Sequence, residues 1–391
     1  MKPTRDDYFT PYEGVLAVSL ELASAHWKIG LNDGRRDNPT VKTVSAGQPA
    51  QRLQQVVDEI AQIKAKWALP SEVRTVVLYE AGQDGFWIAR ALHDWGYEAL
   101  VCDPASIPVP RRARRAKTDR LDAILLVETL RAWLHGERDR MRVIRIPSPE
   151  AEAERHVVRD RGELQKEVMQ HCDRIRKLLR TYGCWETIDR DFARRLAEGQ
   201  CRCHNDEPLP QHLQERLTRE CQRLALVQAQ FEKLDKELVT HLPETTQERV
   251  TKLQRLKGVG TTGATRLTLE LFWRKFSNRE QVGACVGLVP QPNDSGNSRI
   301  DQGISKQGNR RVRSLLIEMS WFWLRYQPSS AISRWYAQFT SGGHGKRTKR
   351  IAIVAVARRL VIVLWRYLEH GVIPEGAQLK PTRATRTTAA A

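Results

Sequence analysis

The sequence predicts an α/β domain followed by a chain that is mainly helical. Up to residue 134, short apolar β-like runs alternate with segments whose apolar residues recur at helical spacing. From residue 151 to 243 the chain is highly charged, and its apolar residues follow helical spacing. The stretch MRVIRIPSPE at 141–150 carries two prolines near its end, which favours a boundary between the two regions.

The elements of the first region follow one another in a defined order. Apolar runs at 14–20 and 25–31 and the TVKTVS segment at 40–45 predict three strands. They are followed by a helix at 49–67, a strand at 73–79, a helix at 86–95, a strand at 97–102 and a helix at 121–134. This is the order of the ribonuclease H arrangement, an α/β fold, and we assign it to residues 1–145.

Residues 146–245 are predicted to form a helical arm. One apolar stripe includes Leu164, Val168 and Ile175, and another includes Leu217 and Leu224. Two long antiparallel helices that pack as a coiled coil and dimerise would explain both stripes. The alternative is a helical spacer within one globule.

Residues 246–372 are expected to form a second compact domain, mainly helical. The segment LQRLKGVGTTGATRLTLEL at 253–271 places three glycines between two helical stretches. This is typical of a helix-hairpin-helix element, whose backbone N–H groups can face a phosphate. An apolar helix with basic flanks is predicted at 346–368, and the tail at 373–391 is predicted to be disordered.

The composition favours a polyanionic partner. The 391 residues carry a formal net charge of +18, with 64 Lys and Arg against 46 Asp and Glu. Arginine suits bidentate phosphate contacts, so nucleic acid is favoured over the alternative of a merely basic soluble protein. No cleavable signal or membrane span is expected, which predicts a cytoplasmic protein.

The seven cysteines are scattered, as expected for reduced thiols in a cytosol. One cluster contains Cys201, Cys203 and His204, with Cys184 and Cys221 at a distance. Zinc sites usually have paired C-x₂₋₄-C spacing, and this C-x-C-H pattern fits such a site poorly.

Several acids stand where a ribonuclease H sheet would present metal ligands. Glu80 ends the apolar run VVLYE, and Asp119 and Asp122 lie three apart at the start of a helix, on one face. Acids at a helix N-terminus also stabilise its dipole, which is the alternative explanation. On the first strand, Glu21 and Ser19 share one side, and only Glu21 is an anionic oxygen ligand. Such carboxylates suit Mg²⁺ or Mn²⁺ in phosphoryl transfer.

Two polar segments accompany these acids. A basic run lies directly before Asp119, where it would guide nucleic acid or form a solvated loop; its members are Arg111, Arg112, Arg114, Arg115 and Lys117. The segment QPNDSGNSRIDQG at 291–303 follows an apolar run and contains Ser295 before a glycine. Taken alone, this segment reads best as an ordinary surface loop.

Several motifs, in the order in which they occur along the chain, resemble those of one family of proteins. Glu21-Leu22 with Trp27-Lys28-Ile29, LYEAG at 78–82 and KTDRLDA at 117–123 are similar to the N-terminal domain of bridge-RNA-guided insertion-sequence transposases, relatives of the Piv DNA invertase. LKGVG, the segment CVGLVPQPNDSGNSRIDQGISKQGNRRVRSLL at 285–316 and KRIAIVAVARRLVIVLW resemble the C-terminal domain of that family. The resemblance spans most of the chain.

The resemblance implies a RuvC-like domain with four acids, a coiled-coil arm and a transposase domain with a nucleophilic serine. The acids map to Glu21, Glu80, Asp119 and Asp122, and the serine to Ser295, within the pattern P-x₄-S-G. The first acid of the family is usually Asp, whereas this chain has the longer Glu21, which can alter metal geometry. The resemblance also implies a dimer or tetramer, donor and target DNA, a structured guide RNA and a bacterial protein associated with the nucleoid when active.

The resemblance leads to a hypothesis of RNA-guided DNA recombination through a phosphoserine intermediate. Cations near the phosphate would be Arg299, Lys306, Arg310, Arg311 and Arg313, with Lys257 at the glycine hairpin; general DNA-facing charge is the alternative for them. Ser298 and Ser305 are rival hydroxyls. A RuvC-like endonuclease that hydrolyses DNA, or a non-catalytic nucleic-acid scaffold, are the alternative functions.

Overall fold

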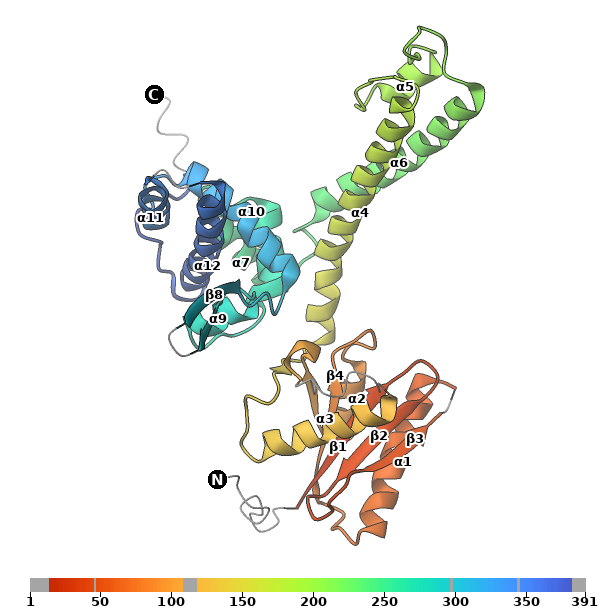
Figure 1. The fold of residues 1–391 in the computed structure, drawn as a ribbon, viewed down its shortest axis with the longest axis vertical. Helices are drawn as coiled ribbons and strands as arrows, with labels where there is room; N and C mark the ends of the chain where they lie inside the picture. The colour runs from red at the N-terminus through yellow and green to blue at the C-terminus, as the bar shows by residue number, and fades with distance from the viewer. Residues whose placement is uncertain (1–13, 46, 108–117, 296–297, 343–344, 382–391) are drawn as a thin grey trace. The chain divides into compact units, whose positions relative to one another are not determined.

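The protein is described by a computed structural model. It describes residues 14–45, 47–107, 118–295, 298–342 and 345–381, and for residues 105, 292–295 and 298–302 it describes the backbone only. The chain divides into two compact units, Met1–Ser148 and Pro149–Ala391. Figure 1 shows the elements of each unit, which are described separately below.

The first unit is built on a six-stranded mixed sheet. Its strands are β1 (Val15–Leu22), β2 (Trp27–Asn32), β3 (Thr40–Val44), β4 (Arg74–Glu80), β5 (Glu98–Cys102) and β6 (Val143–Ile144), in the spatial order β3-β2-β1-β4-β5-β6. β1 pairs antiparallel with β2 and parallel with β4, and β4 pairs parallel with β5. The predicted alternation of strands and helices is confirmed, with β6 as an additional short edge strand. This part is the mixed N-terminal sheet domain expected from the sequence.

Helices cover both faces of this sheet. They are α1 (Pro49–Lys66), α2 (Trp87–Asp94) and α3 (Asp119–Leu134), with a 3₁₀ turn at Pro104–Ser106. Leu16, Val18 and Leu20 of β1 belong to the apolar core that α1 and α2 share, whereas Ala17 belongs to the core beneath α3. Because strand side chains alternate between faces, the odd-numbered residues of β1 face α3.

The second unit begins with two long helices, which together with the segment between them we call the arm. These are α4 (Pro149–Arg180) and α6 (Gln211–Glu237), with the short α5 (Phe192–Ala197) between them (Figure 1). Arg161 pairs with Asp235, and His171 pairs with Glu220 farther along α4. The later residue of α4 thus pairs with the earlier residue of α6, so the two helices are antiparallel. An apolar cluster that includes Ile175 and Leu217 joins them.

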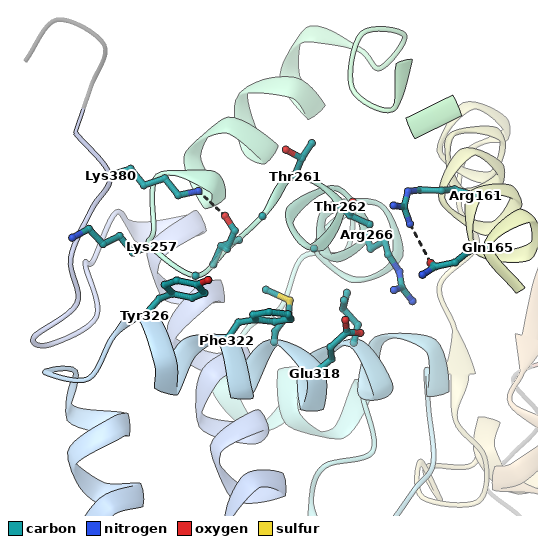
Figure 2. Close-up of a pocket in the computed structure, with 16 residues that line it drawn as sticks. Arg161, Gln165, Lys257, Thr261, Thr262, Arg266, Glu318, Phe322, Tyr326 and Lys380 are labelled. Atoms are coloured by element: carbon teal, nitrogen blue, oxygen red, sulfur yellow. Dashed lines mark hydrogen bonds between the residues drawn. The ribbon is translucent and has the colours of Figure 1, made fainter. Parts of the chain in front are cut away.

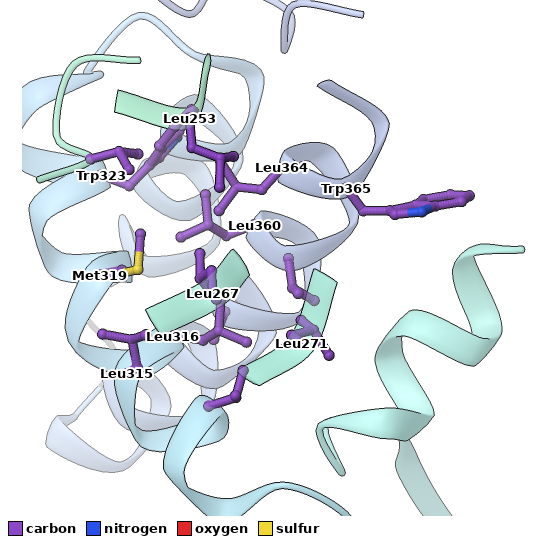
Figure 3. Close-up of a cluster of buried hydrophobic side chains, with 14 of the residues drawn as sticks. Leu253, Leu267, Leu271, Leu315, Leu316, Met319, Trp323, Leu360, Leu364 and Trp365 are labelled. Carbon is purple, nitrogen blue, oxygen red and sulfur yellow. The ribbon is translucent and has the colours of Figure 1, made fainter. Parts of the chain in front are cut away.

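The remaining helices pack around one apolar core (Figure 3). They are α7 (Glu244–Gln254), α8 (Thr261–Leu267), α9 (Arg279–Cys285), α10 (Arg310–Tyr326), α11 (Ala331–Thr340) and α12 (Lys346–His370), with a π-helix at Thr268–Phe272. Leu316, Trp323 and Leu360 are almost fully buried in this core. Burial of each such side chain contributes about 1.5–3 kcal/mol, which is why α10 and α12 pack closely. The region is mainly helical, as predicted.

Two features of the second unit differ from the sequence-based expectations. The polar segment expected as a loop is a β-hairpin of β7 (Pro290–Ser295) and β8 (Ser298–Ile304). The tail is not disordered from residue 373: Ala331 N donates to Glu375 O, and Lys257 N donates to Gln378 O. Leu379 also pairs with Leu256 in an antiparallel bridge, so backbone hydrogen bonds fix this segment. Residues 382–391 lie outside the described part.

Candidate functional site

The ends of β1 and β4 place two acids side by side. The parallel register pairs Leu20 with Tyr79, so the next residues along each strand are Glu21 and Glu80. Both line a pocket of about 300 Å³, together with Ala81, Gly82 and Asp84 among others. By strand alternation both acids lie on the α3 side of the sheet. Asp84 was not singled out from the sequence; its only signal was an acid shortly after the strand end in LYEAGQD.

The carboxylates at this pocket also act on a neighbouring thiol. Burial, together with the charges of Glu80, Asp103 and Glu21, raises the pKa of Cys102 to about 12. Cys102 is fully buried, and its Sγ donates to Tyr79 O at 3.5 Å. The thiol is therefore neutral and serves as packing beneath the acids rather than as a reactive group.

Helix α3 crosses β1 in the opposite direction. Near the middle of β1, Ser19 Oγ donates to Ala123 O at 2.6 Å. Farther along α3, Arg131 Nη1 donates to Val15 O, at the beginning of β1. The N-terminus of α3 must therefore lie toward the end of β1, where Glu21 is found. Ser19 is buried and its hydroxyl is used for this contact, so it positions α3.

Asp119 and Asp122 begin α3 at this same edge. Thr118 caps the helix by accepting from Leu121 N, which explains why the helix starts here. Asp119 Oδ2 lies 3.3 Å from Nε2 of His26, which directly precedes β2. His26 was missed from the sequence because nothing in ELASAHWK marks it as a partner of an acid a hundred residues away.

The donor chemistry of this edge fits a hard divalent cation. Carboxylate oxygens are the ligands that Mg²⁺ and Mn²⁺ prefer, and Glu21, Glu80, Asp119 and Asp122 supply them from two strand ends and one helix start. Within the described residues, no three His, Cys, Asp or Glu side chains are already close enough together to hold a metal ion. The basic run at 111–117, predicted beside these acids, lies outside the described residues.

In the second unit, Ser295 is the last residue of β7. Its backbone pairs with Ser298 at the end of the β7–β8 hairpin, and the segment 296–297 between them lies outside the described residues. The side chains of Ser295 and Arg299 are also outside the described part. The backbone alone therefore places Ser295 at the tip of the hairpin.

The base of the hairpin is held firmly between α9 and α10. Ser305 N donates to Val289 O at 2.9 Å, and Asn309 N donates to Cys285 O at 3.0 Å. Gly287 has φ +65°, and a Cβ there would meet the backbone carbonyl of Gln307. Only glycine allows this close backbone approach without strain. The motif CVGLVP and the motif SKQGN are thus two halves of one hairpin base.

A buried carboxylate connects this base to the arm. Glu270, in the π-helix, accepts from Asn309 Nδ2 at 3.2 Å and from Arg159 Nε of α4 at 2.9 Å. Asn309 is also the N-cap of α10, where its side chain accepts from Arg311 N and Val312 N. Burial acts to raise the pKa of Glu270, but its bonds to Arg159 and Asn309 outweigh burial and lower it.

The glycine-containing turn between α7 and α8, with Gly258, Gly260 and Gly263, forms one wall of a basic pocket of about 600 Å³ (Figure 2). Lys257, Arg266, Lys380 and Arg161 of α4 line it, with a single acid, Glu318. Lys257 Nζ donates to Gln378 Oε1 at 2.6 Å, and Lys380 Nζ donates to Val259 O. The predicted phosphate contact by Lys257 therefore competes with a contact to the C-terminal segment.

The other predicted cations are distributed over separate surfaces. Arg310 and Arg311 line a pocket of about 520 Å³ between α4 and α10. Arg311 Nη2 lies 3.9 Å from Glu163 Oε1. Arg313 Nη1 donates to Val286 O, so this residue supports the hairpin base. Lys306 lies on a different groove, beside α12. The described side chains thus do not gather around one phosphate.

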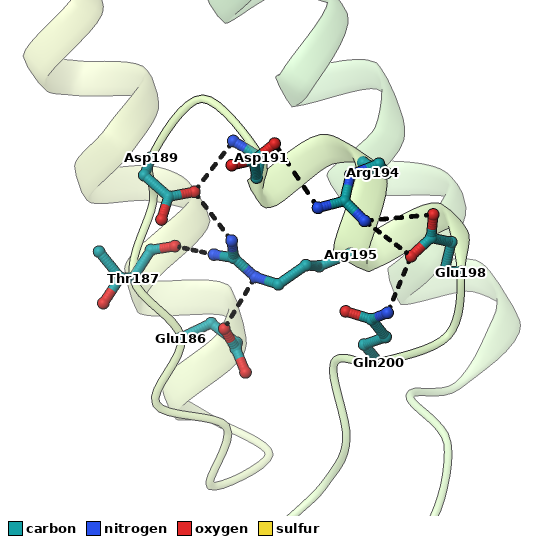
Figure 4. A network of polar contacts seen from close by, with 8 residues as sticks. All are labelled: Glu186, Thr187, Asp189, Asp191, Arg194, Arg195, Glu198 and Gln200. Carbon is teal, nitrogen blue, oxygen red and sulfur yellow. Dashed lines mark hydrogen bonds and ion pairs between the residues drawn. The ribbon is translucent and has the colours of Figure 1, made fainter.

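The cysteines of the arm pack into its apolar core. Cys184 and Cys201 are buried, and burial raises the pKa of both thiols, that of Cys201 to about 11. Among the described residues no three His, Cys, Asp or Glu side chains are grouped so as to hold a metal ion. Arg195 instead fixes the end of the arm by donating to Thr187 O and Asp189 Oδ1 (Figure 4).

An acidic edge on a mixed sheet and a basic helical domain with an anchored hairpin are the two parts expected of a DNA transposase of the DEDD class. A family model described as Transposase IS116/IS110/IS902 family matches residues 250–335, and a model for the DEDD transposase domain of IS110 elements matches residues 39–184. The putative transposase y4rJ of Sinorhizobium fredii is 38% identical over 389 residues, which cover 94% of this chain and 95% of that protein.

More distant relatives agree with this assignment. The transposase for insertion sequence element IS1328 of Yersinia enterocolitica is 25% identical, over 76% of this chain and 85% of its own length. A probable family 20 transposase of Pseudomonas aeruginosa is also 25% identical, over 75% of this chain and 84% of its own. This chain belongs to the IS116/IS110/IS902 family of transposases, enzymes of DNA transposition. A DEDD domain implies a divalent metal. No helix in the described ranges is long and apolar enough to cross a membrane.

Proposed function

We propose that this transposase recombines DNA through a covalent phosphoserine intermediate formed by Ser295. The observation that supports it most is the placement of Ser295 at the tip of a hairpin whose base is locked between α9 and α10. A nucleophile on a rigid hairpin can reach into a DNA substrate while its position stays defined.

The chemistry conserves the number of phosphate esters. Ser295 Oγ attacks the phosphorus of a DNA phosphodiester, its proton is lost, and the bond from phosphorus to one deoxyribose oxygen breaks. That oxygen takes up one proton, which balances the proton lost from Ser295, and leaves as a hydroxyl. A hydroxyl of the partner strand then attacks the phosphoserine and releases Ser295, so strands rejoin without an external energy source.

The acids of the first unit would assist this step. Glu21, Glu80, Asp119 and Asp122 would hold the divalent cation, which when bound neutralises charge on the phosphate. An unperturbed serine hydroxyl is a weak nucleophile, so the proposal requires this acidic edge to meet Ser295, within one chain or from a second subunit.

The replacement of Ser295 by Ala, with Ser298→Ala as a matched control, tests this proposal. Ser298 is the backbone partner of Ser295 at the same hairpin end. We expect Ser295→Ala to lose cleavage and the protein–DNA adduct, while Ser298→Ala retains both. A variant without the Ser295 hydroxyl that still cuts DNA would instead support hydrolysis by a RuvC-like endonuclease.

The motif resemblance further leads us to propose that a structured RNA guides the recombination by pairing with donor and target DNA. The net charge of +18 is compatible with two nucleic acids but does not select RNA. Sequencing of RNA that co-purifies with the protein tests this proposal. We expect one discrete species from a flank of the insertion element, and its absence would count against guidance.

The arm supports the proposal of an oligomer, either a dimer or a tetramer. Met169 of α4 is 60% exposed and Leu226 of α6 is 61% exposed. Because His171 of α4 pairs with Glu220 of α6, Met169 and Leu226 lie at a similar position along the length of the arm. Apolar side chains of this size are usually covered when a coiled coil associates. We expect Leu226→Lys to lower the mass measured by light scattering.

The non-catalytic scaffold is the remaining alternative, and Glu21 in place of Asp prompts it. Strand exchange that requires Mg²⁺ and is abolished by Asp122→Ala would exclude this alternative. A full loss of exchange in the native protein, with DNA binding retained, would support it.

A further inference from the structure

A groove of about 980 Å³ runs along α12 in the second unit. One stripe of α12, from Arg347 to Arg366, forms its floor and one rim, over about 28 Å at the helical rise per residue. The base of the β7–β8 hairpin (Pro290, Ile304 and Lys306) and the start of α11 also line it. Figure 1 shows α11, α12, β8 and α9 in the same part of this unit.

The charge of this groove is almost entirely positive. Among the described residues seven cations line it, with Glu280 as the one acid; they are Arg279, Lys306, Arg347, Arg350, Arg358, Arg359 and Arg366. Arg279 Nε pairs with Glu280 Oε1 at 2.7 Å, and the charge of Arg358 also acts on Glu280. The described part of the chain shows no carboxylate partner for the other five cations. Arg347, Arg350 and Arg366 are exposed. Unpaired guanidinium groups in a row complement a chain of phosphates.

The rest of the lining is apolar. Ile351, Val354, Ile362 and Val363 of α12 lie between the arginines, and Ile332 and Leu288 face them. Ile351 is 55% exposed, although it lies in the middle of a charged surface. Among the residues whose side chains the structure describes, none that lines the groove is Ser, Thr, Asn, Gln or Tyr. An intact duplex would meet the arginines but leave this floor uncovered, because its bases are stacked inside.

We propose that this groove binds a single strand of DNA, with its phosphates on the arginine rims and its sugars and unpaired bases on the apolar floor. Deoxyribose suits the floor better than ribose, because a 2′-hydroxyl would find no uncharged polar side chain among the described lining residues. Since the described lining also has no Asn or Gln side chain to read base edges, we expect binding to be largely independent of sequence.

The location gives the groove a role in the reaction. Its wall is the base of the hairpin that carries Ser295, so a strand held here is delivered toward the hairpin. This role rests on the proposed function of Ser295, whereas the binding itself does not. Binding can therefore be measured without any cleavage.

The test uses the full-length protein and short fluorescent oligonucleotides, followed by anisotropy. The variant Arg347→Ala/Arg350→Ala/Arg358→Ala removes part of the rim, and the control Arg216→Ala/Arg219→Ala/Arg325→Ala removes three exposed arginines from α6 and α10. We expect the rim variant to bind oligothymidine at least tenfold more weakly. The slope of log affinity against log salt should fall by about 2, because each lost contact to a single strand removes about 0.7.

A second variant isolates the apolar floor. Ile351→Gln changes no charge and replaces one residue by a better helix former. Because Ile351 is exposed, we expect the variant to be as stable as the native protein. We expect it to weaken oligothymidine binding severalfold without changing the salt slope, and to leave binding of a blunt duplex unchanged.

Three outcomes would overturn the proposal. One is a rim variant that binds oligothymidine as tightly as the control variant. Another is tighter binding of oligouridine than of oligothymidine, which would assign the groove to RNA. The third is an unchanged DNA affinity with an altered oligomeric state, which would assign it to a protein contact. Loss of cleavage in Ser295→Ala with normal oligothymidine binding leaves the groove intact, so the two proposals fail separately.

Discussion

Ser19 Oγ donates a hydrogen bond of 2.6 Å to the backbone carbonyl of Ala123, and this contact sets α3 directly on β1. Gly30, the partner of Ser19 on β2, leaves the room that this approach needs. A Cβ at Gly30 would lie 2.5 Å from Ser19 Oγ and 2.7 Å from Ala123 O. The acids at the start of α3 therefore depend on a serine and a glycine that carry no charge.

Gly30→Ala tests this dependence. We expect a loss of about 3 kcal/mol in the free energy of unfolding, because a methyl group cannot be placed without moving α3. Gly47→Ala is the control, since a Cβ at Gly47 meets nothing within 4 Å. Urea unfolding of both variants provides the measurement, and equal stabilities would contradict the close packing of α3.

Glu21→Ala tests the acidic edge. Glu21 lines the pocket at the strand ends and is partly exposed, so we expect an unfolding midpoint near that of the native protein. On our proposal that Glu21 helps to hold the cation, we expect Mg²⁺ to raise the melting temperature of the native protein and to raise that of the variant less. Asp58→Asn, an exposed acid of α1, serves as the control and should keep the full rise.

Gly287→Ala tests the hairpin base. The positive φ of Gly287 and its approach to Gln307 make any side chain there strained, and we expect a cost of about 3 kcal/mol together with loss of the protein–DNA adduct. Gly283→Ala is a matched control on α9, because its nearest neighbour would lie at an ordinary 3.6 Å. Gly287→Ala should unfold at a lower temperature than Gly283→Ala, and only Gly283→Ala should still form the protein–DNA adduct.

Glu270 makes stability depend on pH. Its pKa in the folded protein is below the ordinary value of 4.5. The ionised carboxylate therefore stabilises the fold above pH 4.5, and this contribution is lost as the pH falls through the lowered pKa. We expect Glu270→Gln to cost about 3 kcal/mol at neutral pH, because Arg159 loses its buried partner. Urea titrations at several pH values should show a smaller difference between native and variant protein in acid.

Two thiols are expected to be unreactive in the folded protein. With a pKa of about 11 for Cys201 and about 12 for Cys102, at most about one molecule in a thousand carries either thiolate at pH 8. Mass spectrometry after brief alkylation should find both cysteines unmodified until urea is added. Rapid modification without denaturant would show that the arm or the sheet opens readily.

Much of the fold follows from periodicity along the chain. The apolar run that ends in Glu80 becomes β4, and Thr118 before Asp119 starts α3, because strand alternation and helix capping act over a few residues. The hairpin at 290–304 was expected as a loop, since its strands contain polar residues, and its base depends on contacts with α9 and α10. The tail contacts of Gln378 and Lys380 likewise join distant segments.

The sequence by itself determined the class of domain, because periodicity is a property of neighbouring residues. Its motifs also lead to the prediction of the four acids and Ser295 as site residues. Only the tertiary structure decided that Ser19 and Gly30 position α3, that Glu270 joins the arm to the cap of α10, and that six arginines and a lysine share one groove along α12. These contacts form only when segments far apart in the chain pack together and exclude water. No local sequence pattern in either segment predicts them.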